Sequence, residues 1–472
     1  MAIQLPHAAE RATLSVLIDA AIKNVNKDRS KNMIKIIDLM EKTLGDTWRP
    51  EAYENLRNVF RDPNSKYMQY TNNILDNTDP RILKMALLNL GYEAGFRGFH
   101  KVAENSKKYG VSIPWVILID PTSACNMHCT GCWAAEYGHT KSLTYEQLDS
   151  VITQGEALGI HAWVMTGGEP LTRKNDIIKL CEKHNTSAFM AFTNATLIDD
   201  KFAEDMLRVA NFVPSISIEG FKEANDGRRG DGHFDAVMKA FDILKAHKLL
   251  FGTSICYTSV NYKVVTSDEF LDMLISKGVE FTWYFHYMPV GNAASPALLL
   301  TPEEREYMYH RVREIRGYDT GKPIFAIDFQ NDGEFVHGCI AGGKYYCHIN
   351  PNGDVEPCVF VHYSQANIKD KTLLECLQQP LFKAYQAGQP FNDDFLRPCP
   401  MLENPEKLRK IIHDTNAPST DMESPEPVDH LVDKCVDYAK NWTPTAEKLW
   451  SSNHFDYVSP DDAVNQKAAP QD

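Results

Sequence analysis

The stretch 115-WVILIDPTSACNMHCTGC-132 joins a short apolar run to three closely spaced cysteines. Residues 115–119 are continuously apolar, which is typical of a strand buried in a parallel sheet. Cys125, Cys129 and Cys132 follow in a loop with the spacing C-x3-C-x2-C. Three neighbouring thiolates can bind one face of an iron–sulfur cluster, and in a four-iron cluster they leave one iron open for a reaction. A zinc site with His128 as fourth ligand is the alternative.

Short apolar runs alternate with helical stretches beyond this loop. We expect strands at 115–119, 162–165, 188–192, 215–218, 253–256 and 281–285, and helices at 144–158, 174–184, 200–209, 234–247 and 267–277. This alternation predicts an α/β fold of parallel β/α units with right-handed crossovers. Six units form a partial (β/α)6 TIM-like barrel or an open sheet, since a full barrel needs eight. Ligands are then expected at the carboxyl ends of the strands.

The remaining sequence divides around this core. We predict five regions, namely a helical N-terminal domain (1–110), the partial barrel (111–300), a linker helix and strand (301–335), a small cysteine-rich α+β domain (336–405), and a C-terminal helix with a disordered tail after about 457 (406–472). A helix near 93–109 carries Phe96, Phe99 and Val102 on one side. Such a helix can lie on a membrane surface or pack on the next domain.

Composition narrows the class of protein. The 472 residues include 49 Lys and Arg against 63 Asp and Glu, so the net charge is −14. A nucleic-acid binder would need a basic face, so we expect no nucleic-acid partner. No apolar run approaches the roughly 18 residues of a membrane span, and the N-terminus shows no secretion signal. Eleven cysteines, most of them in two groups, indicate reduced, metal-holding thiols and a cytoplasmic location.

The second cysteine group begins at Cys339. Cys347 and Cys358 flank an Asn352-Gly353 turn, which predicts a hairpin that presents one cysteine from each arm. Cys376 and Cys399 follow, whereas Cys181, Cys256 and Cys435 stand alone in apolar or helical patterns and are expected to be core thiols. The spacing suits zinc as well as an iron–sulfur cluster.

The C-x3-C-x2-C loop after the first strand of a partial β/α barrel resembles the radical S-adenosylmethionine (SAM) superfamily, over about residues 120–295. The resemblance implies a [4Fe–4S] cluster on Cys125, Cys129 and Cys132 that binds SAM at its open iron. The family usually has an aromatic residue before the third cysteine, where this chain has Gly131. Trp133 is therefore expected to form the aromatic wall near the adenine.

Further segments resemble the SAM-binding motifs of this family. Gly167-Gly168-Glu169-Pro170 resembles the motif whose edge binds the amino group of SAM, and Asn194 lies in a segment similar to its Thr-Asn-Gly turn. Ser217 and Glu219 share one face of the fourth strand. They resemble the serine and acid that face the SAM ribose, although the family more often has Asp. Arg229 is expected to bind the SAM carboxylate, with Arg228 as the alternative.

Residues 339–399 resemble the SPASM or twitch extension that follows radical SAM cores. The resemblance implies one auxiliary [4Fe–4S] cluster. Its expected ligands are Cys339, Cys347, Cys358 and Cys399, with Cys376 as the replacement for Cys347.

These features predict an enzyme that cleaves SAM reductively and removes hydrogen from an unactivated C–H bond. A low-potential cluster requires a flavodoxin- or ferredoxin-like electron donor. The substrate stays open between a peptide or protein, a lipid or isoprenoid, and a small metabolite. Asp328, in an apolar segment, is a candidate acid or base. A non-catalytic iron–sulfur or zinc scaffold is the alternative, but it would have no use for Glu169, Ser217 or Glu219.

Overall fold

The computed structural model describes residues 6–25, 27–44, 50–317 and 321–452, so the predicted disordered tail lies outside the described part. One sheet of nine strands runs through the molecule in the order β7-β6-β5-β4-β3-β2-β1-β8-β9. Its strands are β1 (Val116–Ile119), β2 (Ala162–Met165), β3 (Ala188–Thr193), β4 (Phe212–Ser217), β5 (Gly252–Tyr257), β6 (Phe281–His286), β7 (Phe325–Asp328), β8 (Tyr346–Ile349) and β9 (Val355–Glu356). Only β8 and β9 pair antiparallel; the other neighbours are parallel.

The first six strands are those predicted from the apolar runs, so the partial barrel is confirmed. The sheet also continues on both sides. β7 pairs with β6, and α14 (Pro302–Arg316) is the crossover helix between them, so residues 301–335 form a seventh β/α unit. β8 pairs with β1, which brings the cysteine-rich segment into the same sheet.

Helices cover the outer face of this sheet. They are α7 (Tyr145–Leu158), α8 (Lys174–Lys183), α9 (Asp200–Val209), α11 (His233–Ala246) and α13 (Asp268–Ser276), while the short α10 (Lys222–Arg229) and α12 (Tyr262–Val265) follow the carboxyl ends of β4 and β5. Thr144 and Thr301 begin α7 and α14 with capping boxes, in which the threonine and a glutamine or glutamate three residues later satisfy each other's backbone N–H groups.

The two faces of the sheet differ in packing. Outward-facing side chains such as Ile117, Met165 and Phe189 are fully buried under the helices and form the main core. Inward-facing side chains such as Leu118 and Phe192 are only partly buried. A closed eight-stranded barrel fills its interior with side chains, whereas this partial barrel leaves its lumen open.

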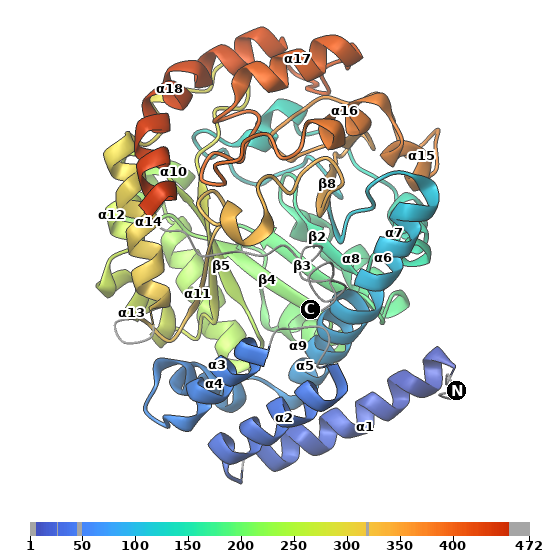
Figure 1. Ribbon diagram of the computed structural model, residues 1–472, viewed down its shortest axis with the longest axis vertical. Coiled ribbons are helices and arrows are strands. Elements are labelled where there is room, and N and C mark those ends of the chain that lie inside the picture. Colours follow the sequence, from blue (N-terminus) through green and yellow to red (C-terminus); the bar gives the residue numbers. More distant parts are fainter. Residues whose placement is uncertain (1–5, 26, 45–49, 318–320, 453–472) are drawn as a thin grey trace, which may run out of the picture.

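The N-terminal region is helical as predicted. Its elements are α1 (His7–Val25), α2 (Arg29–Leu44), α3 (Pro50–Arg61), α4 (Lys66–Asn77), α5 (Pro80–Met85), a π-helical stretch (Ala86–Gly98) and α6 (Phe99–Tyr109). Figure 1 shows α1 to α5 in blue at the lower end of the sheet, and α6 rising beside the sheet on the right. Asn89 donates to the carbonyls of Asn185 and Ser187, just before β3, and the Asp79 N–H donates to the carbonyl of Lys248, before β5. The N-terminal helices therefore cover the amino ends of the strands.

The C-terminal helices lie at the opposite end of the sheet, in orange and red in Figure 1. They are α15 (Leu373–Leu377), α16 (Pro380–Gly388), α17 (Pro405–Thr415) and α18 (Val428–Ser452). Residues 406–452 thus form two helices where the sequence suggested one, and these pack around a second core that includes Tyr438 and Trp442. Within the described ranges, no helix combines the length and apolar character needed to cross a bilayer.

Candidate active site

One cavity of about 1460 Å³ occupies the lumen of the partial barrel. At the carboxyl ends of the strands it is bordered by two groups of thiols. The first group is Cys125, Cys129 and Cys132, and the second is Cys339, Cys358 and Cys399. The fold therefore brings six of the seven predicted metal ligands to one space.

The first thiol group lies in the loop after β1. Burial raises the pKa of Cys125 to about 11, so a metal must displace the proton before this thiol can bind as a thiolate. His128 is exposed and packs edge-on against His139, with ring centroids 5.3 Å apart. It does not border the cavity, so the zinc alternative lacks its fourth ligand. Three sulfur donors that face open space are a ligand set suited to an iron–sulfur cluster with one free corner.

In the described chain, no three His, Cys, Asp or Glu side chains converge on a position for a single metal ion. The thiols of this loop are therefore not arranged around one ion in the present conformation.

Two glycines hold this loop against the end of β2. The Gly168 and Glu169 N–H groups donate to the carbonyls of Thr122 and Ala124 at 3.0 and 2.9 Å. A Cβ on Gly168 would lie 2.4 Å from the Ala124 carbonyl oxygen, and Gly167 has a φ of +103°. Only glycine meets both demands, so Gly167 and Gly168 position the cysteine loop while they border the cavity.

Glu169 is fully buried, and its carboxylate is used within the protein. It accepts hydrogen bonds from the Thr193 hydroxyl and the Asn194 N–H, both at 2.7 Å, and from the Leu171 N–H at 2.9 Å. Burial raises the pKa of Glu169, and these hydrogen bonds oppose the rise. Asn194 in turn donates from Nδ2 to Asn126 at 2.8 Å. The predicted motif residues thus tie the ends of β2 and β3 to the cysteine loop.

Glu219 corrects one prediction. Its Oε1 accepts from Arg228 Nη1 and Arg229 Nη2, both at 2.6 Å, and its Oε2 accepts from the Cys256 N–H at 3.0 Å. The carboxylate is covered and does not border the cavity, so it is not placed to face a ribose. Ser217, Arg228 and Arg229 do border the cavity. Glu219 therefore acts as the anchor of the two arginines.

The anchored arginines lie beside the first thiol group. Arg229 Nη1 is 3.8 Å from Sγ of Cys129, and Arg228 Nη2 is 3.5 Å from the carbonyl oxygen of Gly131. Burial raises the pKa of the neighbouring Cys132 thiol, and the two arginines oppose this rise. Either arginine can meet an anionic group in the cavity, which keeps both candidates for the SAM carboxylate.

Aromatic rings frame the loop. Trp133 borders the cavity and meets the His348 and Phe360 rings edge-on, at centroid distances of 5.7 and 6.2 Å. A Cβ on Gly131 would lie 2.9 Å from the Tyr287 ring. Tyr287, at the end of β6, therefore occupies the space beside Gly131 where the family usually places its own aromatic residue.

The second thiol group corrects the predicted auxiliary ligands. The Tyr346 hydroxyl donates to Sγ of Cys358 at 2.7 Å, so Tyr346 faces the cavity. Successive residues of a strand point to opposite faces, and Cys347 is fully buried in the main core beside Cys376. Neither Cys347 nor Cys376 borders the cavity. The prediction of Cys347, or of Cys376 in its place, is therefore wrong for this geometry.

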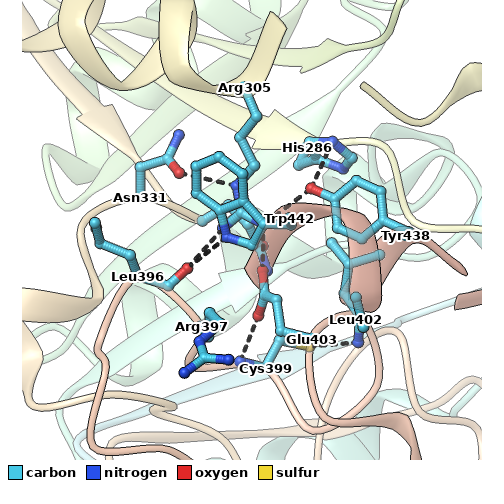
Figure 2. Close-up of polar contacts among 12 residues, drawn as sticks. His286, Arg305, Asn331, Leu396, Arg397, Cys399, Leu402, Glu403, Tyr438 and Trp442 are labelled. Carbon is cyan, nitrogen blue, oxygen red and sulfur yellow. Dashed lines mark hydrogen bonds and ion pairs between the residues drawn. The ribbon is translucent and has the colours of Figure 1, made fainter. Parts of the chain in front are cut away.

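A buried ion pair fixes the loop of Cys399 (Figure 2). Arg305, from α14, pairs with Glu403 at 2.6 Å, and both side chains are fully buried. Glu403 Oε2 accepts from the Cys399 N–H at 2.7 Å. Arg305 also donates to Tyr438 and Leu396, and its guanidinium lies 4.3 Å from the Trp442 ring centroid. A barrel helix and α18 thus hold an auxiliary cysteine in place.

A second buried charged group was not predicted. His348 lies between two carboxylates, with Nε2 3.0 Å from Asp120 and Nδ1 2.7 Å from Glu356. Burial disfavours the charged imidazole, but the two carboxylates outweigh it and raise the pKa of His348 to about 10. Tyr137 donates to Glu356 at 2.7 Å. This group joins β1 to the β8–β9 hairpin just behind Trp133.

Two further residues differ from expectation. Cys256, interpreted from sequence as a core thiol, borders the cavity at the end of β5. Asp328 does not border it, because its carboxylate accepts from Tyr257 and Asn331 at 3.2 and 2.7 Å in the protein interior. Burial raises the pKa of Asp328 to about 6, but the group has no access to a substrate in the lumen.

Comparison with known proteins identifies the class. Residues 119–275 match the radical SAM superfamily, and residues 339–401 match the SPASM iron–sulfur cluster-binding domain. The chain therefore contains a radical SAM domain followed by a C-terminal SPASM domain, as its sequence predicted. The first domain implies SAM and a [4Fe–4S] cluster, and the second implies auxiliary iron–sulfur clusters.

Individual relatives are distant. An uncharacterised protein of Archaeoglobus fulgidus is 33% identical over 243 residues, which cover 50% of this chain and 56% of the relative. An AdoMet-dependent heme synthase of Oleidesulfovibrio alaskensis is 24% identical over 60% of this chain and 78% of its own. The mycofactocin maturase MftC of Mycolicibacterium smegmatis is 25% identical over 53% and 66%.

A solved structure shares the fold. Streptococcus suis SuiB bound to S-adenosylmethionine superposes with a TM-score of 0.54 and 19% identity, over 66% of this chain and 78% of SuiB. The N-terminal helices of the present chain lie outside both matched domains.

Proposed function

We propose that this protein cleaves SAM reductively and removes a hydrogen atom from a C–H bond of a substrate held in the lumen. One observation carries this proposal: the first thiol group, the SAM-motif segments and the second thiol group all border the same cavity. When bound, the reduced [4Fe–4S] cluster and SAM supply a 5′-deoxyadenosyl radical, which is a cofactor chemistry that the protein directs.

Different residues at the carboxyl end would bind different parts of the cofactors. Cys125, Cys129 and Cys132 would hold the first cluster, and the backbone of Gly167 and Gly168 offers an edge for SAM. Arg228 and Arg229, fixed by Glu219, supply positive charge beside these groups. Trp133 and Tyr287 supply ring surfaces around them.

The second thiol group serves an auxiliary cluster. Cys339, Cys358 and Cys399 would hold it, and Tyr346 hydrogen-bonds Cys358. Since hydrogen bonds to ligand sulfurs tune cluster potentials, Tyr346 would affect this site. Both clusters would face one lumen, with the substrate between them.

Electrons must reach the first cluster from outside. Asn126, His128 and Thr130, which alternate with residues facing the cavity, are exposed. The outer side of the cysteine loop is therefore a docking position for a flavodoxin- or ferredoxin-like donor.

The test is anaerobic reconstitution followed by reduction with dithionite in the presence of SAM. Wild-type protein is expected to form 5′-deoxyadenosine, and a variant with Cys125, Cys129 and Cys132 changed to alanine is expected to form none above background. Cys181→Ala, at a buried thiol of α8, is the matched control and should retain activity. Undiminished 5′-deoxyadenosine from the triple variant, or a wild-type protein that holds only zinc, would refute the proposal.

A further inference from the structure

The wall of the lumen is apolar along its length. Its inward-facing strand residues include Val116, Leu118, Met190, Phe192, Trp283 and Phe285. They come from β1, β3 and β6, so the wall is apolar on several sides. Because these side chains stay partly uncovered, the lumen is a space that an apolar ligand could fill.

The N-terminal helices extend this surface past the amino ends of the strands. They contribute aliphatic side chains such as Ile22, Val25, Met33, Ile36, Ile74 and Leu75. Leu87, Leu90 and Phe99 border the same cavity and are 52, 47 and 50% exposed. We call these three residues the rim, since they join the cavity to the outer surface.

Charge is confined to the other end. The charged residues that border the cavity are Glu169, Arg228, Arg229 and Asp332, and none of the bordering residues from the described N-terminal helices is charged. A peptide in this half would need partners for its backbone N–H and C=O groups, because unpaired amides are costly to bury. An aliphatic chain needs none. The volume of about 1460 Å³ also exceeds the roughly 300–1,000 Å³ of ordinary small-ligand pockets.

We propose that the substrate is a lipid whose long aliphatic chain passes from the rim through the lumen to the first thiol group, with its polar head outside the rim. This rests on the proposed function and adds its substrate class. In the reaction, a C–H bond of the chain breaks. The hydrogen atom would pass to the 5′-deoxyadenosyl radical to give 5′-deoxyadenosine, and the chain carbon would keep the unpaired electron.

The test measures binding of cis-parinaric acid, a fluorescent fatty acid, to the reconstituted full-length protein. Val213 of β4 pairs with Met190 of β3 and borders the lumen between the N-terminal helices and Ser217. Val213→Trp should therefore fill the lumen at this level. Leu87→Gln combined with Leu90→Gln makes the rim polar at exposed positions that lie outside the hydrophobic core clusters. Each variant should weaken binding by about tenfold or more, since tenfold corresponds to about 1.4 kcal/mol.

Matched controls are available in the same chain. Val260→Trp repeats the first substitution at a site that is 76% exposed and outside the cavity. Leu17→Gln combined with Leu39→Gln repeats the second on exposed leucines of α1 and α2 that do not border it. Both controls should bind like wild type. Wild-type protein without saturable binding, or equal affinity in all four variants, would overturn the proposal.

Competitors separate the sources of the chain. Hexadecanol that displaces the probe better than phytanol indicates a linear acyl chain, and the reverse order indicates an isoprenoid; both support a lipid. An apolar decapeptide that competes as well as either alcohol would overturn the lipid class. The dithionite assay separates the two proposals, because formation of 5′-deoxyadenosine without probe binding rejects only the lipid. Probe binding without 5′-deoxyadenosine rejects the radical function.

Discussion

The two ends of the lumen are lined by different kinds of chemical groups. At the amino end, uncharged side chains of the N-terminal helices border the cavity. At the carboxyl end lie thiols, glycine backbone and buried charged groups, including Arg305–Glu403 and Asp120–His348–Glu356. Removing one partner of a buried ion pair lowers the stability of the folded protein. Substituting the exposed leucines at the rim should not lower it in this way. The carboxyl end, as the cofactor end, should therefore tolerate fewer substitutions than the amino end, which our proposal makes the substrate end.

The largest effect is expected at the cofactor end, from Arg305→Met. This substitution leaves Glu403 buried without its ion partner and should lower the free energy of unfolding by about 3–5 kcal/mol. Urea denaturation measures the change. Arg409→Met, which removes exposed pairs with Asp429 and Asp433, should cost about 1 kcal/mol or less. Similar losses from the two variants would erase the contrast between buried and surface charge.

The next effect separates the cysteines of the hairpin. Cys358→Ala should reduce the iron content from about eight to about four per chain, as expected for two four-iron clusters. Cys347→Ala should leave it near eight, because its thiol points into the main core. Iron analysis of both reconstituted variants makes the comparison. Equal iron loss in the two would restore Cys347 as a ligand.

A smaller effect concerns pH. The pKa of His348 is raised from 6.5 to about 10, so the stability contributed by its charged form is complete below about pH 6.5 and is lost as pH rises toward 10. One proton gives a slope of at most about 1.4 kcal/mol per pH unit. Urea denaturation between pH 6.5 and 10 should show a steeper decline in wild type than in His348→Gln. Parallel declines would mean that His348 is uncharged in the fold.

The smallest effect is expected at the substrate end. If the rim meets a membrane to collect its lipid, co-sedimentation with phospholipid vesicles should weaken about threefold or more in a Phe96→Ser, Phe99→Ser variant, because apolar area is lost from the contact. Phe221→Ser changes an exposed phenylalanine elsewhere and should not alter it. Wild-type protein that does not co-sediment would limit the N-terminal helices to covering the lumen.

Much of the fold is readable from local patterns. Buried parallel strands give continuous apolar runs, so the observed β2 coincides with the predicted strand at 162–165. The pairings of β7 with β6 and of β8 with β1 are long-range. Nothing in residues 324–349 alone indicates which edge they join, so the sequence predicted a linker at 301–335 and a separate cysteine-rich domain at 336–405.

The site could be predicted from the sequence where its residues are neighbours in the chain, as in the cysteine loop and Gly167-Gly168-Glu169. It was not readable where distant residues meet. The partners of Glu219 are the two arginines considered for the SAM carboxylate, and the partners of His348 lie directly after β1 and on β9. Cys347 was also mispredicted, although it lies close in sequence to Cys358. Its strand is buried on both faces, and cysteine spacing alone does not show which face points to the cavity.

The coverage of the amino ends by N-terminal helices has a consequence for selectivity. Strands of fixed length separate the rim from the cysteine loop. A lipid held by its head group at the rim would therefore always place the same position of its chain at the cysteine loop. The distance from the head group, rather than the chemical groups next to it, would then determine which carbon reacts. Lengthening or shortening the bound molecule would move the reacting position along it while the protein stays unchanged.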